Sequence, residues 1–311
     1  MKASSLLCIL PFVFACGGNN NNDPEVCNDQ IDNDGDTLVD CNDDQCAADA
    51  ACQNPPAVVG GFQSPESVFF DTDTSTWYVT NQGGQGAGDG FVSKLDAVGN
   101  VVELNFATGL DNPRGSRAVN GKLYVADDNG VFVIDLLEGL ILDEIDPGVV
   151  VDSFLNDVAV DPASGDVFVS DSGTGIIHRL AGGVTPSVFL QDAQFDFPNG
   201  LLFENGTLFI TNFGDGKLFS FNPAADPALS VIVNGGLGQP DGIERDGTNL
   251  LVTDFGGRLL NVDANGAITV LFDGSAIFDA AADLAFDPAR RVAAVPELFG
   301  TEVNFIDLDD L

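Results

Sequence analysis

The sequence has few basic residues and a single histidine. Its 311 residues include 11 lysines and arginines against 48 aspartates and glutamates, which gives a formal net charge of -37. This excess of negative charge repels phosphate backbones and anionic membrane surfaces, so we expect no nucleic-acid partner. The same charge fits either a solvated, exported surface or a surface that gathers cations. One histidine also excludes catalysis by a histidine pair.

Long apolar segments are lacking beyond the first residues of the chain. The apolar run over residues 6–14 is too short to span a bilayer, and its layout is typical of a bacterial export signal over residues 1–15. The letters "VFAC" resemble a lipobox, which would make Cys16 the lipidated N-terminus; a plain secretory signal is the alternative. Residues 16–26 have the composition of a flexible tether. We therefore expect an exported protein, lipid-anchored at the bacterial cell envelope, that contacts the membrane only through its lipid.

Cysteine is confined, outside the first 16 residues, to one short segment over residues 27–55. Four cysteines in an exported chain predict two disulfides, and the sequence leaves three pairings open. A zinc site is the competing interpretation, although the segment has no CxxC pair. The four residues are Cys27, Cys41, Cys46 and Cys52.

The same segment carries aspartates at positions 1, 3, 5, 9 and 12 of a loop, namely Asp32, Asp34, Asp36, Asp40 and Asp43. Oxygen ligands at this spacing can surround Ca²⁺. The loop is similar to those of thrombospondin type 3 repeats. It predicts a second Ca²⁺ site, with an acidic, disulfide-held spacer as the alternative.

Residues 56–311 contain short apolar runs of period two, separated by turns rich in glycine. This pattern disfavours helices. The runs recur in units of four, about every 42 residues, and each unit opens at one polar anchor residue. The six anchors are Glu66, Arg114, Asn156, Asn199, Asp241 and Asp283.

Four short strands in each unit predict an all-β fold, a six-bladed β-propeller. The last unit stops after its third apolar run, and the unassigned run "AVVGGF" lies at residues 57–62. We therefore expect the N-terminal strand to complete the last blade. This arrangement closes the ring and removes exposed strand edges.

The anchors are expected to converge on one end of the central channel, because the first strand of each propeller blade lies innermost. Five of them offer carboxylate or amide oxygens: Glu66, Asn156, Asn199, Asp241 and Asp283. An oxygen-rich set without histidine or cysteine suits Ca²⁺ rather than Zn²⁺. The alternative is that the polar anchors only cap strands through turn hydrogen bonds.

The motifs "SPESVFFD", "LNDVAVD", "FPNGLLF" and "QPDGIE" resemble the family of gluconolactonases and senescence marker protein, across nearly all of residues 56–311. The resemblance implies a divalent cation, Ca²⁺ or another, held by Glu66, Asn156, Asn199 and Asp241. It implies further that this cation polarises a lactone carbonyl and that Asp241 positions or deprotonates the attacking water.

Other residues are candidate substrate contacts at the channel mouth. Arg114 either holds a substrate carboxylate or oxyanion, or pairs with Asp283. Phe213 and Phe255 are expected in the pocket wall, and residues 82–90 form either a lid or a hairpin loop. Polar residues that end second strands are expected beside them: Asn81, Asp127, Asp171, Asn212 and Asp254. The single histidine, His178, falls in a third strand and is not expected to be catalytic.

Two functions are compatible with these features. The first is a monomeric, Ca²⁺-dependent hydrolase of a lactone or other small ester. The second is a non-catalytic propeller, anchored at the surface, that binds protein or glycan and whose axial Ca²⁺ is structural. The fold alone does not choose between them.

Overall fold

The computed structural model describes residues 55, 57–84, 86–278 and 280–311. Asn54–Leu311 form one compact unit, which is the predicted β-propeller. The predicted lipidation site at Cys16, the four cysteines predicted to form disulfides and the predicted Ca²⁺ loop all lie outside the described residues.

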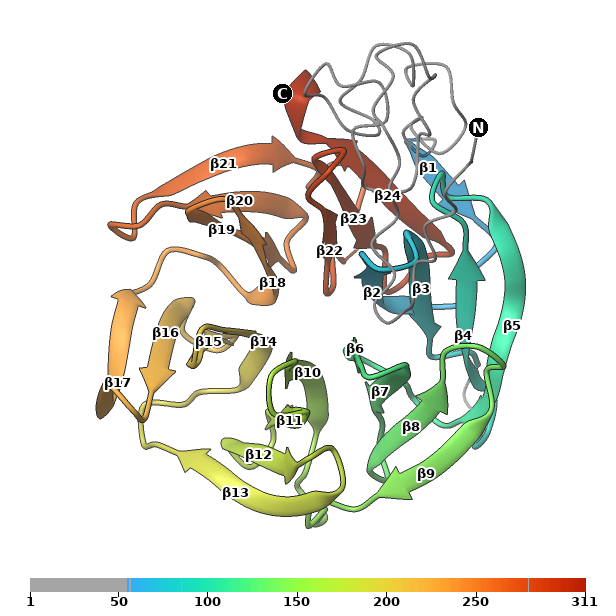
Figure 1. The fold of residues 1–311 in the computed structure, drawn as a ribbon. Helices are drawn as coiled ribbons and strands as arrows, with labels where there is room; N and C mark the ends of the chain where they lie inside the picture. The colour runs from blue at the N-terminus through green and yellow to red at the C-terminus, as the bar shows by residue number, and fades with distance from the viewer. Residues whose placement is uncertain (1–54, 56, 85, 279) are drawn as a thin grey trace, which may run out of the picture. The chain divides into compact units, whose positions relative to one another are not determined.

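The propeller consists of six antiparallel sheets of four strands each, arranged around a central axis (Figure 1). Blade 1 contains β2 (Pro65–Asp71), β3 (Thr76–Asn81), β4 (Gly90–Leu95) and β5 (Val101–Leu110). Blade 2 contains β6 (Ser116–Val119), β7 (Lys122–Ala126), β8 (Val131–Asp135) and β9 (Ile141–Ile145). Blade 3 contains β10 (Leu155–Asp161), β11 (Asp166–Asp171), β12 (Ile176–Ala181) and β13 (Thr185–Gln191). Blade 4 contains β14 (Pro198–Glu204), β15 (Thr207–Asn212), β16 (Lys217–Asn222) and β17 (Asp226–Val233). Blade 5 contains β18 (Pro240–Asp246), β19 (Asn249–Asp254), β20 (Arg258–Val262) and β21 (Ile268–Asp273). Blade 6 contains β22 (Ala285–Asp287), β23 (Val292–Pro296), β24 (Glu302–Asp307) and β1 (Val58–Gly60). A 3-10 turn, Leu308–Asp310, follows β24.

The ring closes as the sequence predicts. The strand β1 from the N-terminal part of the propeller pairs antiparallel with β24, and Val59 lies opposite Val303. In Figure 1 this pairing brings the blue β1 beside the red β24. The last blade therefore combines three strands from the end of the chain with one from its beginning, and the prediction for residues 57–62 is confirmed.

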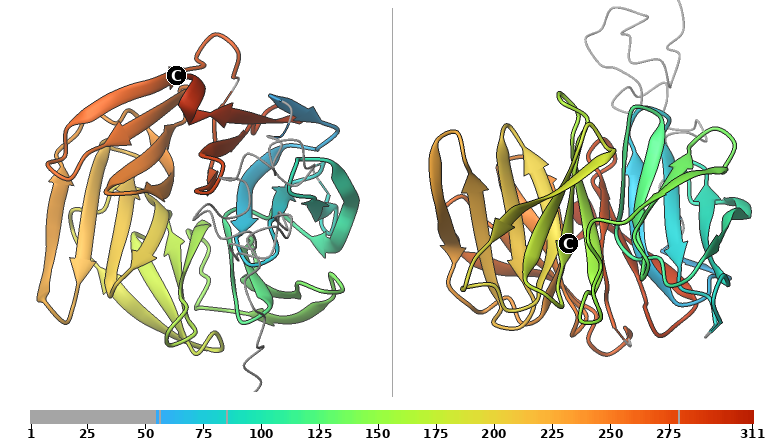
Figure 2. Two further views of the ribbon diagram at one scale, coloured as in Figure 1. Left: turned by 45° about the horizontal axis from the view of Figure 1, so that its top comes forward. Right: turned by 90° about the horizontal axis from the view of Figure 1, so that it is seen from below.

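Apolar side chains fill the spaces between neighbouring blades. Where blade 1 meets blade 6, the ring of Trp77 lies edge-on to Phe305, with ring centroids 5.2 Å apart. Middle strands such as β3 are buried on both faces, because each sheet has a neighbouring blade on either side. The strands run between the two ends of the propeller, as the side view in Figure 2 shows. We call the end at which the innermost strands begin the anchor end.

The recurring Pro-x-Gly motif has a packing cause. A Cβ atom added to Gly200 would lie 2.1 Å from the carbonyl oxygen of Asp241, and one added to Gly242 would lie 2.3 Å from Oδ1 of Asp283. A Cβ on Gly115 would lie 2.5 Å from the Cα of Asp157. In each case the glycine of one blade lies against the anchor segment of the next blade. The glycine therefore fixes how closely neighbouring blades approach near the axis.

Replacing Gly200 by alanine is expected to lower the free energy of unfolding by about 1–3 kcal/mol, because the added methyl group must displace the Asp241 backbone. Urea unfolding monitored by circular dichroism measures the change. Gly60→Ala is the matched control, since its nearest neighbour is a flexible side-chain atom of Glu302 at 3.7 Å. Equal stability of the Gly200 variant and the wild type would contradict this account of the motif.

Candidate functional site

Four of the six anchors occupy the same position in their blades. Each is the second residue of an innermost strand, and each strand has a shift of register there against its neighbour. Such β-bulges redirect side chains. The four are Glu66, Asn156, Asn199 and Asp241. All four side chains are buried.

This placement corrects the expectation that every anchor precedes its strand. Only Arg114 and Asp283 do so, since β6 begins at Ser116 and β22 at Ala285. The bulge therefore distinguishes the four residues of the predicted metal set from the other two anchors, and no pattern of residue types in the sequence reveals it.

Three oxygens of this set have no hydrogen-bond partner although they are buried. They are Oε2 of Glu66, Oδ1 of Asn199 and Oδ1 of Asp241. The side chain of Asn199 also hydrogen-bonds to Asp241. Buried polar atoms are nearly always satisfied in proteins, so orphaned carboxylate and amide oxygens indicate a missing electropositive partner. Their chemistry fits a hard cation such as Ca²⁺.

Buried carboxyl groups crowd this part of the channel. Burial raises the pKa of Glu66 well above its usual range, and the charges of Asp241 and Asp283 raise it further. Burial and the neighbouring Asp283 likewise raise the pKa of Asp241. The pKa of Asp157, beside Asn156, rises to about 7, mainly through burial. Without a cation, this cluster carries a large cost of burying like charges.

Threonine side chains hold the anchor strands in place. The hydroxyl of Thr211 accepts a hydrogen bond from the N–H of Gly200 at 2.7 Å and donates one to the carbonyl of Asp241 at 2.9 Å. Thr253 repeats this arrangement between Gly242 and the carbonyl of Ala282. Each threonine therefore links one anchor strand to that of the next blade. The sequence analysis did not identify this role, although "ITN" and "VTD" repeat the threonine at the same place.

The polar residues that end the second strands do not line a pocket as expected. They are buried, and their side chains accept hydrogen bonds from backbone N–H groups of the loop that enters the first strand of the same blade. Asp171 binds the N–H of Phe154 at 2.8 Å, and Asp254 binds that of Gln239 at 2.8 Å. The other three accept hydrogen bonds in the same way: Asn81 from the N–H of Gln63, Asp127 from the N–H groups of Asp111 and Asn112, and Asn212 from the N–H of Asp196. These residues fix the loops of the anchor end.

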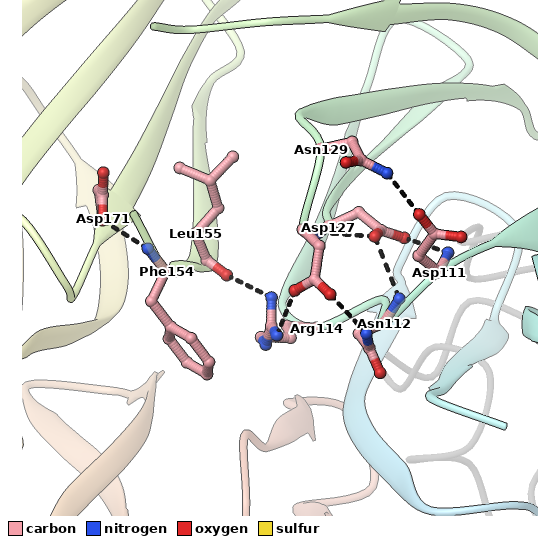
Figure 3. A network of polar contacts seen from close by, with 9 residues as sticks. Asp111, Asn112, Arg114, Asp127, Asn129, Phe154, Leu155 and Asp171 are labelled. Atoms are coloured by element: carbon pink, nitrogen blue, oxygen red, sulfur yellow. Dashed lines mark hydrogen bonds and ion pairs between the residues drawn. The ribbon is translucent and has the colours of Figure 1, made fainter. Parts of the chain in front are cut away.

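Arg114 takes part in a local network and does not pair with Asp283 as one interpretation proposed. Its guanidinium forms an ion pair with Asp128 at 2.6 Å and donates to the carbonyl of Leu155 at 3.0 Å. It also lies over the ring of Phe154, 4.0 Å from the centroid. Figure 3 shows Arg114 between blade 2 and the Phe154–Leu155 segment of blade 3. The positive charge of Arg114 partly opposes the rise in the pKa of Glu66.

An ion pair that the sequence analysis missed crosses the channel. Arg117 of blade 2 binds Glu244 of blade 5, and both side chains are largely buried. Blades 2 and 5 lie opposite each other in the ring of six (Figure 1). The charge of Arg117 also acts on Asp157 and Asp283. Arg117 and Glu244 each lie three residues after the anchor of their blade. Two residues of opposite charge at the same position of facing blades could have predicted this ion pair from the sequence.

A cavity of about 510 Å³ opens at the anchor end between blades 1, 2 and 6. Among its lining residues are Ser64, Gln82, Asp111, Asn112, Asp128 and Phe299. The loop over residues 82–90 borders it and is held in place by hydrogen bonds. Asp89 accepts from the N–H groups of Gly84 and Gly86 at 3.1 and 2.9 Å, and the N–H of Gly88 donates to Asp111 at 2.7 Å. In its described residues this loop is an ordinary hairpin connection rather than a free lid.

Phe213 and Phe255 lie in contact beside the channel mouth, with ring centroids 5.6 Å apart. His178 lies in the third strand of blade 3, buried, with its Nε2 3.8 Å from Oδ2 of Asp171. The position of His178 in a third strand agrees with the sequence analysis, whereas Phe213 and Phe255 are not among the residues that line the cavity of about 510 Å³.

Within the described part of the chain, no three histidine, cysteine, aspartate or glutamate side chains form a cluster suited to a metal ion. The axial set contains two carboxylates and two amides. The described residues also include no helix long and apolar enough to cross a membrane.

Comparisons with known proteins identify the fold. No family model and no curated protein matches the chain. A catalytically inactive virginiamycin B lyase from Staphylococcus aureus, solved with quinupristin, has a TM-score of 0.55 and 12% identity over 80% of this chain and 98% of that one. Another structure of this lyase gives a TM-score of 0.56 and 11% identity over the same shares. A nidogen/laminin complex gives a TM-score of 0.54 and 20% identity, over 66% of this chain and 78% of that one. At these identities the likeness shows a β-propeller fold alone, and the chain is a six-bladed β-propeller.

Proposed function

We propose that this protein is a Ca²⁺-dependent hydrolase of a lactone or other small ester. The observation that carries the proposal is the group of orphaned, buried oxygens on Glu66, Asn199 and Asp241. These oxygens come from three different blades and lie among carboxyl groups whose pKa values are raised. The resemblance of the anchor motifs to gluconolactonases supports the same reaction.

In this proposal Glu66, Asn156, Asn199 and Asp241 hold the cation. When bound, Ca²⁺ acts as a Lewis acid on the carbonyl of the substrate. Asp241 accepts a proton from, or orients, the water that attacks this carbonyl. The hydrogen bond from Asn199 fixes the orientation of the Asp241 carboxylate. The bulged strands keep these side chains rigidly placed, which is what positioning a reacting water requires.

Adding Ca²⁺ to the metal-free, full-length protein is expected to raise its melting temperature. A ligand at 100 times its dissociation constant stabilises the folded state by about 2.7 kcal/mol, and in a domain of this size that corresponds to a shift of several degrees. Differential scanning calorimetry after chelation and readdition of Ca²⁺ measures it.

The aspartate loop over residues 32–43 is itself a predicted Ca²⁺ site, so it needs its own control. Asp34→Asn in that loop is expected to leave the Ca²⁺-dependent shift of the propeller in place, whereas Glu66→Gln removes it. An equal shift in the Glu66 variant and the wild type would show that the ion binds elsewhere.

The hydrolase itself is tested by following the turnover of a panel of lactones and aryl esters with and without chelator. Turnover that disappears with chelator and returns with Ca²⁺ supports the proposal. A protein that binds Ca²⁺ on its axis yet turns over nothing in the panel supports the second candidate, a surface-anchored propeller that binds protein or glycan.

Export, the lipid anchor at Cys16 and a monomeric state belong to both candidates and remain proposals. The disulfides and the second Ca²⁺ loop also remain proposals under both candidate functions. Mass spectrometry of the protein from membranes, before and after reduction, tests the lipid and the disulfides together.

A further inference from the structure

Three phenylalanines form a continuous aromatic edge at the anchor end. Phe213, Phe255 and Phe299 come from loops of blades 4, 5 and 6, and we call them the aromatic rim. The rings of Phe213 and Phe255 meet edge-on at 5.6 Å, and those of Phe255 and Phe299 at 6.0 Å. Phe299 is 65% exposed, and the other two are half-buried. A contiguous exposed apolar edge of this kind marks an interaction site more often than an isolated surface phenylalanine does.

The rim is tied to the axial residues through the backbone. The N–H of Phe213 donates to the carbonyl of Phe197, and the N–H of Phe255 donates to the carbonyl of Gln239, each at 2.9 Å. Phe197 and Gln239 stand two residues before Asn199 and Asp241. Phe197 also has a positive φ of 55°, an uncommon conformation for a bulky residue that clusters at functional sites. The backbone of Phe213 and Phe255 is therefore held beside the segments that carry two of the proposed metal ligands.

The opposite side of the channel mouth is polar. The cavity of about 510 Å³ includes Phe299, so the rim continues into it, and its far wall includes Asp128. Asp128 binds Arg114, whose guanidinium stacks on Phe154. The aromatic contacts of blades 4 to 6 therefore end at Phe299 in this cavity, and the polar contacts of Asp128 and Arg114 begin in the same cavity and lead to Phe154 of blade 3. One part of the mouth is apolar and another is carboxylate-rich.

Charge decides which ligands this mouth accepts. Arg114 is neutralised by Asp128, and Asp111 adds a further carboxylate to the cavity wall. The whole chain has a formal net charge of -37. These carboxylates disfavour an anionic ligand, and the pairing of Arg114 with Asp128 disfavours the alternative in which Arg114 holds a substrate carboxylate. The rings of the rim offer apolar area without hydrogen-bond donors or acceptors, so they suit an alkyl or aryl group better than the hydroxyls of a sugar.

We propose that the aromatic rim binds the alkyl or aryl substituent of an uncharged lactone or ester whose carbonyl end faces the axial oxygens. This inference rests on the proposed function and names its substrate class. The apolar substituent lies on Phe213, Phe255 and Phe299, and the charge of the mouth selects against carboxylate-bearing substrates.

Binding of unreactive analogues tests the rim independently of catalysis. Pyrrolidin-2-ones that carry methyl, butyl or hexyl tails are lactams that resist hydrolysis, and their dissociation constants for the full-length protein with Ca²⁺ are measured by isothermal titration calorimetry. In the wild type each added methylene group is expected to tighten binding by about two- to fourfold. Phe299→Ala is expected to flatten this dependence, because its ring is the most exposed of the three. Leu137→Ala is the matched control, since Leu137 is 83% exposed in the loop between β8 and β9 at the other end of the strands.

The outcomes separate this inference from the proposed function. Tail-length dependence that is lost in Phe299→Ala and kept in Leu137→Ala supports the rim even if no lactone is hydrolysed. Lactone hydrolysis with no dependence of affinity on tail length overturns the rim and leaves the hydrolase standing. Tighter binding of glucono-δ-lactone than of the hexyl lactam, or of an alkylammonium ion than of the lactam of equal length, overturns the substrate class.

Discussion

Replacing Asp241 by asparagine is expected to lower kcat/KM for a lactone by about 10²- to 10⁴-fold, the usual contribution of a positioned acid or base. It is also expected to abolish the rise in melting temperature with Ca²⁺. Asparagine keeps the shape of the side chain and one oxygen, but it loses the negative charge and the ability to accept a proton. Lactone kinetics and calorimetry on the same preparation measure both effects.

The metal-free Asp241→Asn protein is expected to be as stable as the metal-free wild type or more stable. Burial and the charge of Asp283 raise the pKa of Asp241, so its ionised form is costly in the fold when no cation is present. A general loss of structure would lower stability instead, and this opposite sign distinguishes the two explanations. Glu138→Gln, exposed in the turn between β8 and β9, is the control for a loss of negative charge alone. An unchanged Ca²⁺ response in Asp241→Asn would remove the ground for the axial site.

The six-bladed ring could be predicted from the sequence because each blade repeats the same pattern of residues. Polar anchors about 42 residues apart, each followed by strands of period two, specify six similar blades. The missing strand of the last unit specifies where the N-terminal strand must go, and β1 pairs with β24 there. Both inferences depend only on local patterns and on the need to leave no strand edge open.

The site was predicted less completely, because residue type does not reveal what a side chain binds. Asp171 and Asn212 at the ends of second strands have the same chemistry as Asn199, yet they bind backbone N–H groups. The distinction lies in the β-bulges of β2, β10, β14 and β18, which the sequence does not show directly.

The pairing of Arg114 was predicted wrongly for a related reason. Its partner Asp128 lies in the loop after the second strand of its own blade and not in the ring of anchors. The contacts of Arg117 and Glu244 depend on which blades face each other across the axis, and this follows only once the ring is closed.

Replacing Arg117 by methionine is expected to lower the free energy of unfolding by about 3–5 kcal/mol, the typical cost of leaving one partner of a buried ion pair uncompensated. The side chains of Arg117 and Glu244 are only 12% and 14% exposed, so water cannot replace the lost partner. Asp157 and Asp283 lose the same counter-charge, because Arg117 acts on both. Urea unfolding of the metal-free protein measures the loss. The double variant Arg117→Met/Glu244→Gln is expected to recover much of it, since both charges are then absent.

The surface residue Arg291 gives the matched comparison. It pairs with Asp246 and Asp309 but is 39% exposed, and Arg291→Met is expected to cost about 1 kcal/mol or less. Ca²⁺ is expected to return part of the stability lost in Arg117→Met, because a cation on the axis lies among the same carboxylates that Arg117 compensates. Arg117→Met should therefore gain more stability from Ca²⁺ than the wild type does. An equal gain in both proteins would mean that the ion pair across the channel and the proposed metal site are electrostatically independent.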